Sequence, residues 1–234
     1  MRYLLFLFFV TSAFAQQRKV SLRLLAFDGS KVPQESYFFD PAAPEPAAGL
    51  PAPVKNYLNH ERLNLNLFGN DMVFSSSLKV ADARNADLQL GKVTLPTTSS
   101  EFLLVFLPGE GTKYHVMAVD DSVKGFPLGG YRVLNLSRFP IKLTLEDKPY
   151  DFKPGQGSVI TDPPLQANNH SAMYAFSQVD GKWQRIGSGL WPSPGKKRSI
   201  QIFFDNPTSG NTELRGFKDI SPPIPKPAAQ AVAP

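Results

Sequence analysis

Residues 100 to 121 read SEFLLVFLPGEGTKYHVMAVDD, and this stretch decides the fold class. Phe102, Leu104 and Phe106 recur at every second position, so a strand would carry them on one face. Pro108 and Gly109 then favour a turn, and a second strand-like run ends in two acids. The stretch predicts two consecutive β-strands joined by a turn.

The same period of two recurs along the chain, separated by turn signals. Five further runs show it: Val20-Leu22-Leu24, Leu63-Leu65-Leu67, Tyr131-Val133, Ile141-Leu143-Leu145 and Ile200-Ile202-Phe204. Asp180-Gly181 lies between two such runs and predicts a β-hairpin. No window has the i, i+3, i+4, i+7 spacing of an amphipathic helix. The chain is therefore predicted to be all-β, with very little helix.

The order of strands appears twice. Residues 199–219 (SIQIFFDNPTSGNTELRGFKD) repeat the strand, turn and strand of residues 100–121. An opening strand-like run precedes each of them, at residues 19–28 and 130–137. Self-similarity of this kind indicates a duplicated unit.

The duplication predicts two tandem antiparallel β-sandwich domains of the immunoglobulin-like kind, at residues 16–122 and 123–220. The joint would fall near residues 122–128, where Gly125 and Pro127 interrupt the strand pattern. The alternative is one continuous sandwich, whose strands resemble one another because all strands do.

Residues 1–15, MRYLLFLFFVTSAFA, have the layout of a secretory signal peptide. Arg2 forms a positive n-region, Leu4–Val10 an apolar h-region, and Ala13 and Ala15 an A-x-A cleavage site. Export with cleavage after residue 15 is therefore predicted. The alternative is an uncleaved membrane anchor, for which the apolar run is short.

Two segments are rich in proline, at residues 41–53 and 221–234. Proline offers no backbone N–H to a sheet and interrupts helices. The first segment is predicted to be a surface loop and the second a disordered Pro/Ala-rich tail.

The composition excludes several functions. The chain has no cysteine, which excludes disulfides, thiol catalysis and thiolate metal sites. An exported chain without disulfides favours a bacterial periplasmic or extracellular location. The formal net charge of +5 is small for 234 residues, and only Lys196-Lys197-Arg198 forms a basic cluster. A nucleic-acid partner is therefore not expected, because such proteins gather basic residues on one face.

No catalytic, metal-binding or cofactor-binding constellation is predicted. His60, His115 and His170 lack both the spacing of metal ligands and a nucleophile motif beside them. The adjacent acids Asp120-Asp121 and Glu146-Asp147 point to opposite faces of a strand, so neither pair can flank one bond. At strand ends, such acids are expected to be solvated.

The best binding signal is a group of aromatic residues. Tyr174, Phe176, Trp183 and Trp191 lie on the hairpin around Asp180-Gly181 and on the loop after it. Flat rings on a sandwich face can stack on sugar rings, and tryptophan adds an N–H donor. The alternative is that the rings fill the core.

The predicted ligand-binding residues are Trp183, Trp191 and Tyr174. Among them, Trp191 is expected to be the surface-exposed ring, because Pro192 and Pro194 follow it.

Residues 126–137 (FPLGGYRVLNLS), followed by Lys153-Pro154-Gly155, resemble a family of exported bacterial all-β proteins without an assigned function. The strand SEFLLVFLP and the series Trp183…Trp191…Arg198 are also similar to the layout of that family. The resemblance implies the fold and the exported location, and it brings no catalytic residues to this chain.

The sequence predicts an exported, cofactor-free, non-enzymatic β-sandwich protein that binds to, or is a structural part of, the bacterial cell envelope. Its partner would be an envelope glycan or protein, and the mature chain would have no transmembrane segment. One alternative is a carbohydrate- or peptide-active hydrolase using Asp and Glu. Another is a structural subunit that adds strands edge to edge.

Overall fold

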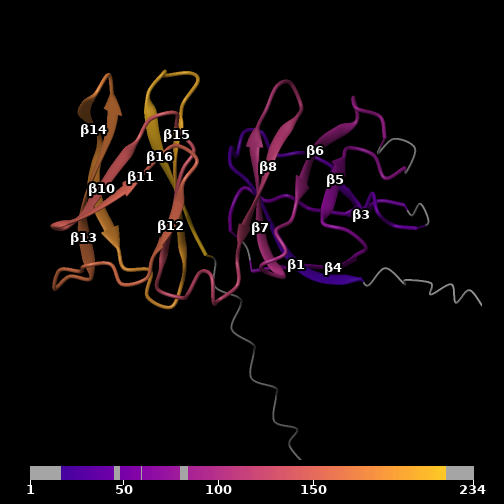
Figure 1. Cartoon of the computed structure of the whole chain (residues 1–234), viewed down its shortest axis with the longest axis horizontal. Coiled ribbons are helices and arrows are strands. Elements are labelled where there is room, and N and C mark those ends of the chain that lie inside the picture. The colour runs from indigo at the N-terminus through magenta and orange to yellow at the C-terminus, as the bar shows by residue number, and fades with distance from the viewer. Residues whose placement is uncertain (1–16, 45–47, 59, 80–83, 220–234) are drawn as a thin grey trace, which may run out of the picture.

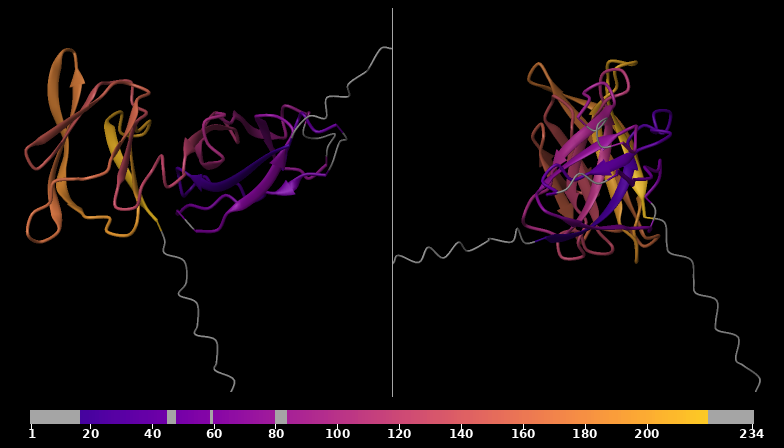
Figure 2. Two further views of the ribbon diagram at one scale, coloured as in Figure 1. Left: turned by 60° about the horizontal axis from the view of Figure 1, so that its bottom comes forward. Right: turned by 90° about the vertical axis from the view of Figure 1, so that its right-hand side faces the viewer.

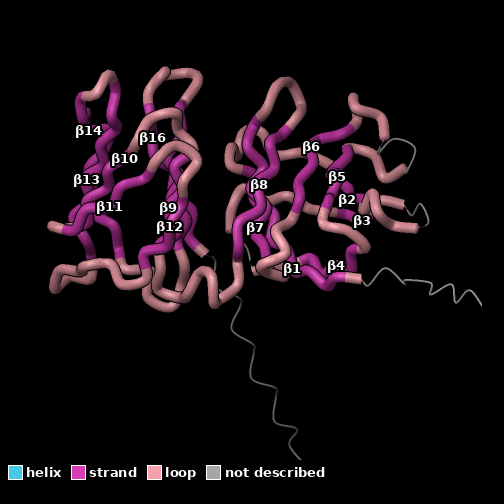
Figure 3. The backbone as a smooth tube through the Cα atoms, viewed as in Figure 1, coloured by secondary structure: helices cyan, strands magenta, loops and turns pink. Residues whose placement is uncertain are grey.

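The computed structural model describes residues 17–44, 48–58, 60–79 and 84–219, and in these residues the regular structure is entirely β (Figures 1 and 3). The strands are β1 (Arg18–Ala26), β2 (Tyr37–Phe39), β3 (Leu50–Pro51), β4 (Leu63–Leu67), β5 (Asp71–Ser75), β6 (Gln89–Thr94), β7 (Glu101–Pro108), β8 (Tyr114–Asp120), β9 (Tyr131–Asn135), β10 (Ile141–Leu145), β11 (Lys148–Phe152), β12 (Gly157–Ile160), β13 (His170–Val179), β14 (Lys182–Pro192), β15 (Ser199–Asp205) and β16 (Thr212–Lys218). No helix occurs in the described ranges, which confirms the all-β prediction.

The strands form four sheets of four strands. The orders are β4-β1-β7-β8 and β3-β2-β5-β6 for the first eight strands, and β12-β9-β15-β16 and β11-β10-β13-β14 for the last eight. Adding eight to each strand number of the first pair of sheets gives the second pair. The pairing is therefore duplicated strand for strand, and the two stretches compared in the sequence, 100–121 and 199–219, contain the equivalent hairpins β7–β8 and β15–β16.

The strand order differs from that of an immunoglobulin domain, where the first two strands are neighbours in one sheet. Here β1 lies between β4 and β7, and β2 lies between β3 and β5. The immunoglobulin-like arrangement is therefore not confirmed.

The prediction of purely antiparallel sheets is wrong for two strand pairs. β1 pairs with β7 in parallel, and β9 pairs with β15 in parallel. The chain passes through five other strands before it returns beside its first strand, and parallel neighbours require such a long connection.

Each half has a core between its own two sheets. In the first half this core includes Leu22 and Phe102 from one sheet and Phe74 from the other. In the second half it includes Val133 and Phe203 from one sheet and Leu143 from the other. Face-to-face packing of two sheets around such a core is the β-sandwich architecture.

Figure 2 shows the two halves next to each other. A third apolar cluster contains residues of both halves. Leu103 and Val105 of β7 pack there with Ile200 and Ile202 of β15. β7 is buried on both faces, and its sequence is accordingly a continuous apolar run rather than an alternating one. The two halves therefore share an apolar interface formed by the outer faces of their parallel-containing sheets.

Several local predictions can be compared with the structure. Asp180 and Gly181 form the two-residue turn between β13 and β14, both with positive φ (51° and 75°), which confirms the predicted hairpin. The segment 41–53, which was predicted to be a loop, contains the short edge strand β3. Its residues 45–47 lie outside the described residues. The predicted signal peptide (1–15) and the predicted tail (221–234) also lie outside them. Among the described residues, no helix is long and apolar enough to cross a membrane.

Candidate functional site

Trp191 belongs to the core of the second half, so the prediction that it is surface-exposed is wrong. It is 6% exposed, and its ring lies 4.9 Å from that of Tyr131, centroid to centroid. On β14 it stands opposite Ser171 of β13, which is itself fully buried. The register of β14 turns the indole inward, and the prolines that follow do not alter this. Trp191 therefore cannot form part of an exposed binding platform.

Trp183 and Tyr174, in contrast, lie on the outer face of the sheet β11-β10-β13-β14. On β13, Met173 and Ala175 are buried in the core and therefore define the inner face of the strand. Because side chains alternate along a strand, Tyr174 and Phe176 point to the outer face. Trp183 stands opposite Gln178, which shares the outward parity of Tyr174.

Tyr174 is 42% exposed and Trp183 is 40% exposed. Leu190 of β14, at 59%, adds a further apolar side chain to this face. Tyr174, Phe176, Trp183 and Leu190 together are called the outer aromatic face. In Figure 1 this sheet is the outermost layer of the second half, with no strand beyond it.

Two cations accompany the rings. Lys142 of β10 stands opposite Phe176, and its Nζ lies 4.5 Å from the centroid of the Trp183 ring. Arg185 of β14 stands opposite Phe176 on the other side. A cation over an indole face is attracted by the negative quadrupole of the ring. Sequence reasoning did not identify Lys142, although its position between inward-facing Ile141 and Leu143 places it on the outer face.

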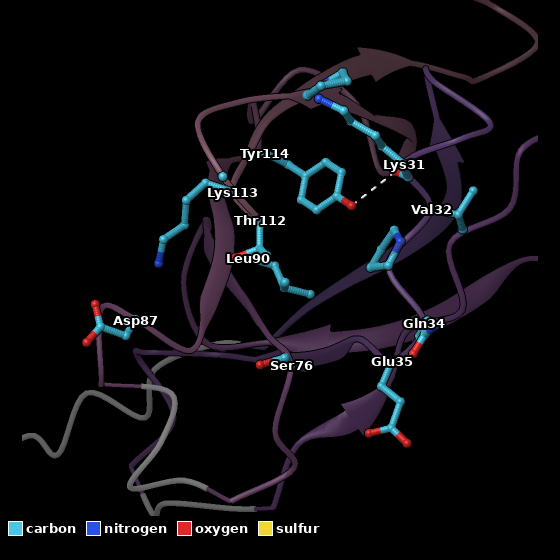
Figure 4. Close-up of a pocket in the computed structure, with 13 residues that line it drawn as sticks. Lys31, Val32, Gln34, Glu35, Ser76, Asp87, Leu90, Thr112, Lys113 and Tyr114 are labelled. Atoms are coloured by element: carbon cyan, nitrogen blue, oxygen red, sulfur yellow. Dashed lines mark hydrogen bonds between the residues drawn. The ribbon is translucent and has the colours of Figure 1, made fainter.

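A second candidate site is a cavity of about 530 Å³ in the first half (Figure 4). The volume lies within the range of small-molecule pockets. Its walls come from four segments: the connection from β1 to β2, the end of β5, the start of β6 and the turn between β7 and β8. Leu90 and Tyr114 form apolar parts of the lining, and Lys31, Glu35 and Asp87 bring charges of both signs.

Tyr114 is held in place at this cavity. Its hydroxyl donates a hydrogen bond of 3.0 Å to the carbonyl oxygen of Lys31 (Figure 4). Partial burial, with a smaller contribution from the negative charge of Asp28, raises the pKa of the Tyr114 phenol. The side chain thus stays neutral near pH 7 and acts as a hydrogen-bond donor.

The acid pair Asp120-Asp121 has structural partners, and the expectation that these acids are solvated is wrong for Asp121. Asp121 is 1% exposed, and both of its carboxylate oxygens accept hydrogen bonds from Arg23, at 2.6 and 2.7 Å. Asp120 accepts a hydrogen bond of 2.8 Å from the Ser99 hydroxyl. Asp121 is buried because it lies at the junction of the two halves, which its sequence position does not reveal.

Arg198, Asp219 and the partly exposed Arg62 join Asp121 and Arg23 in a group that is called the junction ion network. Arg62 Nη2 donates to Asp121 Oδ2 at 3.0 Å. Arg23 Nη1 donates to Asp219 Oδ1 at 2.6 Å, and Arg198 Nε donates to Asp219 Oδ2 at 2.9 Å. Arg198 also donates to the backbone carbonyl of Asp121 at 2.9 Å. Two buried arginines are thus paired with two acids, which compensates the cost of burying the charges.

Within the ranges that the structure describes, no group of three or more His, Cys, Asp or Glu residues is placed to hold a metal ion.

Comparison with protein-family models finds no match, and comparison with curated proteins finds none either. Among solved structures, the chain is similar to a crystal structure of a "putative cell adhesion protein" from Bacteroides fragilis NCTC 9343. The identity is 10% and the TM-score 0.20, over 78% of this chain and 82% of that chain. A TM-score this low supports no inference about function.

Proposed function

We propose that this chain is an exported, non-enzymatic binding protein of the bacterial cell envelope, and that the outer aromatic face is its contact surface. The observation that carries the proposal is the exposure of Trp183 and Tyr174 on one open sheet face. Large rings are normally drawn into cores, and here Trp191 and Tyr131 follow that rule. Two exposed rings on one sheet face therefore favour a binding surface.

The chemistry of the face favours an envelope glycan. Exposed aromatic rings can stack on the apolar faces of sugar rings, while Lys142 and Arg185 supply donors for hydroxyl or acidic groups at the edge of the site. A protein partner of the envelope would use the same rings as contact anchors. The contact proposed is thus apolar at its centre and cationic beside it.

We also propose that residues 16–122 and 123–220 are two tandem β-sandwich domains that belong with exported bacterial all-β proteins. Strand pairing within each half and a separate core in each half support the division. Export is supported by the signal-peptide pattern of residues 1–15. Cleavage there predicts a mature chain beginning at Gln16.

The test is co-sedimentation of the mature chain, residues 16–234, with isolated bacterial cell envelopes at low and high salt. Trp183→Ala and Tyr174→Ala remove the exposed rings. Tyr57→Ala is the matched control, because Tyr57 is 45% exposed and belongs to the first half. Binding that survives high salt is expected for a contact centred on apolar stacking, since salt screens exposed charges.

The proposal predicts that Trp183→Ala and Tyr174→Ala lose most of the salt-resistant binding while Tyr57→Ala keeps it. It is overturned if the wild-type chain does not sediment with envelopes at either salt concentration. Equal binding by all three variants would also overturn it.

A further inference from the structure

The strand β14 has a free edge, and we propose that this edge pairs with β14 of a second copy of the chain. β14 is the last strand of the sheet β11-β10-β13-β14, so among the described residues only β13 pairs with it. It spans 11 residues, and most of them are exposed. A long edge strand presents unpaired N–H and C=O groups, and these can extend a sheet by adding another strand.

The internal repeat shows how the other half protects the equivalent edge. There β6 lies against β8 so closely that a Cβ on Gly91 would meet the backbone oxygen of Tyr114 at 2.8 Å. Lys113 adds a hydrogen bond of 2.9 Å from its Nζ to the carbonyl oxygen of Gln89 on β6. In the second half, β14 and β16 touch only marginally. A Cβ on Gly187 or Gly189 of β14 would have no atom within 4 Å.

Between Gly187 and Trp191 the sequence of β14 lacks the usual protection of an edge, and its one proline, Pro192, is the last residue of the strand. Natural edge strands are commonly protected by charged side chains, prolines or bulges. In β14 the two charged residues, Lys182 and Arg185, and the bulge beside Ile186 all lie in the first part. From Gly187 to Trp191 the strand has no charge and no proline.

The distribution of charge favours a second copy as the occupant. In a two-fold interface each partner uses the same segment, and two copies of one strand then run antiparallel. Antiparallel pairing of two β14 strands around Ser188 and Gly189 brings the uncharged parts together. Lys182 and Arg185 of each copy stay away from those of the other. Leu190, which is 59% exposed, would gain apolar contacts at this interface.

The tail of the same chain is a poorer occupant. Residues 221–234 contain five prolines, and each proline removes one of the N–H groups that a sheet requires. A β14 strand of a second copy is already extended and held by β13. Its pairing therefore fixes little additional backbone, which keeps the conformational entropy cost low.

The test is sedimentation velocity of the mature chain, residues 16–234, over a wide range of concentrations. Ser188→Lys places a charge on the free edge of β14, where two copies would bring two lysines close together. Ser158→Lys is the matched control, because Ser158 is an exposed serine on β12, an edge strand of the other sheet. Thermal unfolding of both variants checks that the fold is kept.

The wild-type chain is expected to form a dimer as its concentration rises. Ser188→Lys should raise the dimer dissociation constant by about tenfold or more, a change of about 1.4 kcal/mol. Ser158→Lys should leave the constant unchanged. A wild-type chain that stays monomeric at every concentration overturns the proposal, and so does an equal effect of the two lysine variants.

Discussion

At the scale of single residues, the junction ion network shows how much depends on Asp121. Its carboxylate binds Arg23 through both oxygens, and both side chains are almost completely buried. The residue follows β8 immediately, and in the sequence it is one of two adjacent acids without a distinguishing mark. Its role could not be predicted because both of these partners are distant in the sequence. Arg23 is 98 residues away, and Arg198 belongs to the other half.

Asp121→Asn is predicted to lower the free energy of unfolding by about 3–5 kcal/mol, since it leaves the buried Arg23 without its bidentate partner. The control is Arg138→Gln, because Arg138 is 68% exposed and lies 3.5 Å from Asp205. An exposed pair of this kind contributes about 0–1 kcal/mol. Urea unfolding of both variants measures the difference. Similar losses in the two variants would contradict the structural role assigned to Asp121.

Tyr131 offers a pH-dependent test. Burial raises the pKa of its phenol to about 12, and its hydroxyl donates a hydrogen bond to the backbone oxygen of Pro192. The ordinary pKa of tyrosine is about 10, so the unfolded chain loses this proton first. The contribution of Tyr131 to stability is therefore complete below about pH 10 and is lost as the pH rises toward 12.

Tyr131→Phe is predicted to lower the free energy of unfolding by about 1 kcal/mol near neutral pH, because one hydrogen bond is removed. Its stability should also fall less steeply than that of the wild-type chain above about pH 10. Urea unfolding at a series of pH values measures both effects. Identical pH profiles for the two proteins would show that Tyr131 does not titrate as described.

At the scale of secondary-structure elements, the hairpin β13–β14 was the most predictable part of the fold. Asp180-Gly181 satisfies the backbone requirement of a two-residue turn, and that requirement is local. The faces of β14 were less predictable. A register shift between Ala175 and Phe176 changes which residues of β14 face inward. The exposure predicted for Trp191 rested on Pro192 and Pro194, and these prolines do not reveal the shift.

Gly181→Ala is predicted to destabilise the protein by about 1–2 kcal/mol, since Gly181 has φ of 75° and a side chain is unfavourable in that conformation. Gly187→Ala is the control, because a Cβ there meets open space and Gly187 has no positive φ. Its effect should stay within about 0.5 kcal/mol. Thermal unfolding at low protein concentration compares the two. An equal effect would mean that the turn geometry does not limit stability.

At the scale of the whole molecule, the apolar cluster between the halves joins them into one structure. The run FLLVFL in β7 gives the signal for it, because continuous apolar residues indicate a strand buried on both faces. The alternating pattern accounted for the burial of Phe102, Leu104 and Phe106 only, and these residues belong to the core of the first half. Leu103 and Val105 face the second half, and which half covers them depends on the relative placement of distant strands.

This shared cluster predicts a single cooperative unfolding transition for the mature chain. Leu103→Ala should lower the free energy of unfolding by about 2–5 kcal/mol, because it leaves a cavity in the interface between the halves. Leu78→Ala, at a side chain that is 51% exposed, should change it by less than about 0.5 kcal/mol. Calorimetry distinguishes one transition from two. Two separate transitions in the wild-type chain would contradict the coupling of the halves.

The central claim is that the outer aromatic face contacts the cell envelope, and fluorescence of Trp183 tests it most directly. The chain has two tryptophans, of which Trp191 is buried and Trp183 is exposed. Acrylamide should therefore quench mainly Trp183 in the free protein. Adding isolated envelopes is predicted to shield Trp183 and to reduce the quenching. If the protein sediments with envelopes while the quenching of Trp183 stays unchanged, another surface makes the contact and the claim is wrong.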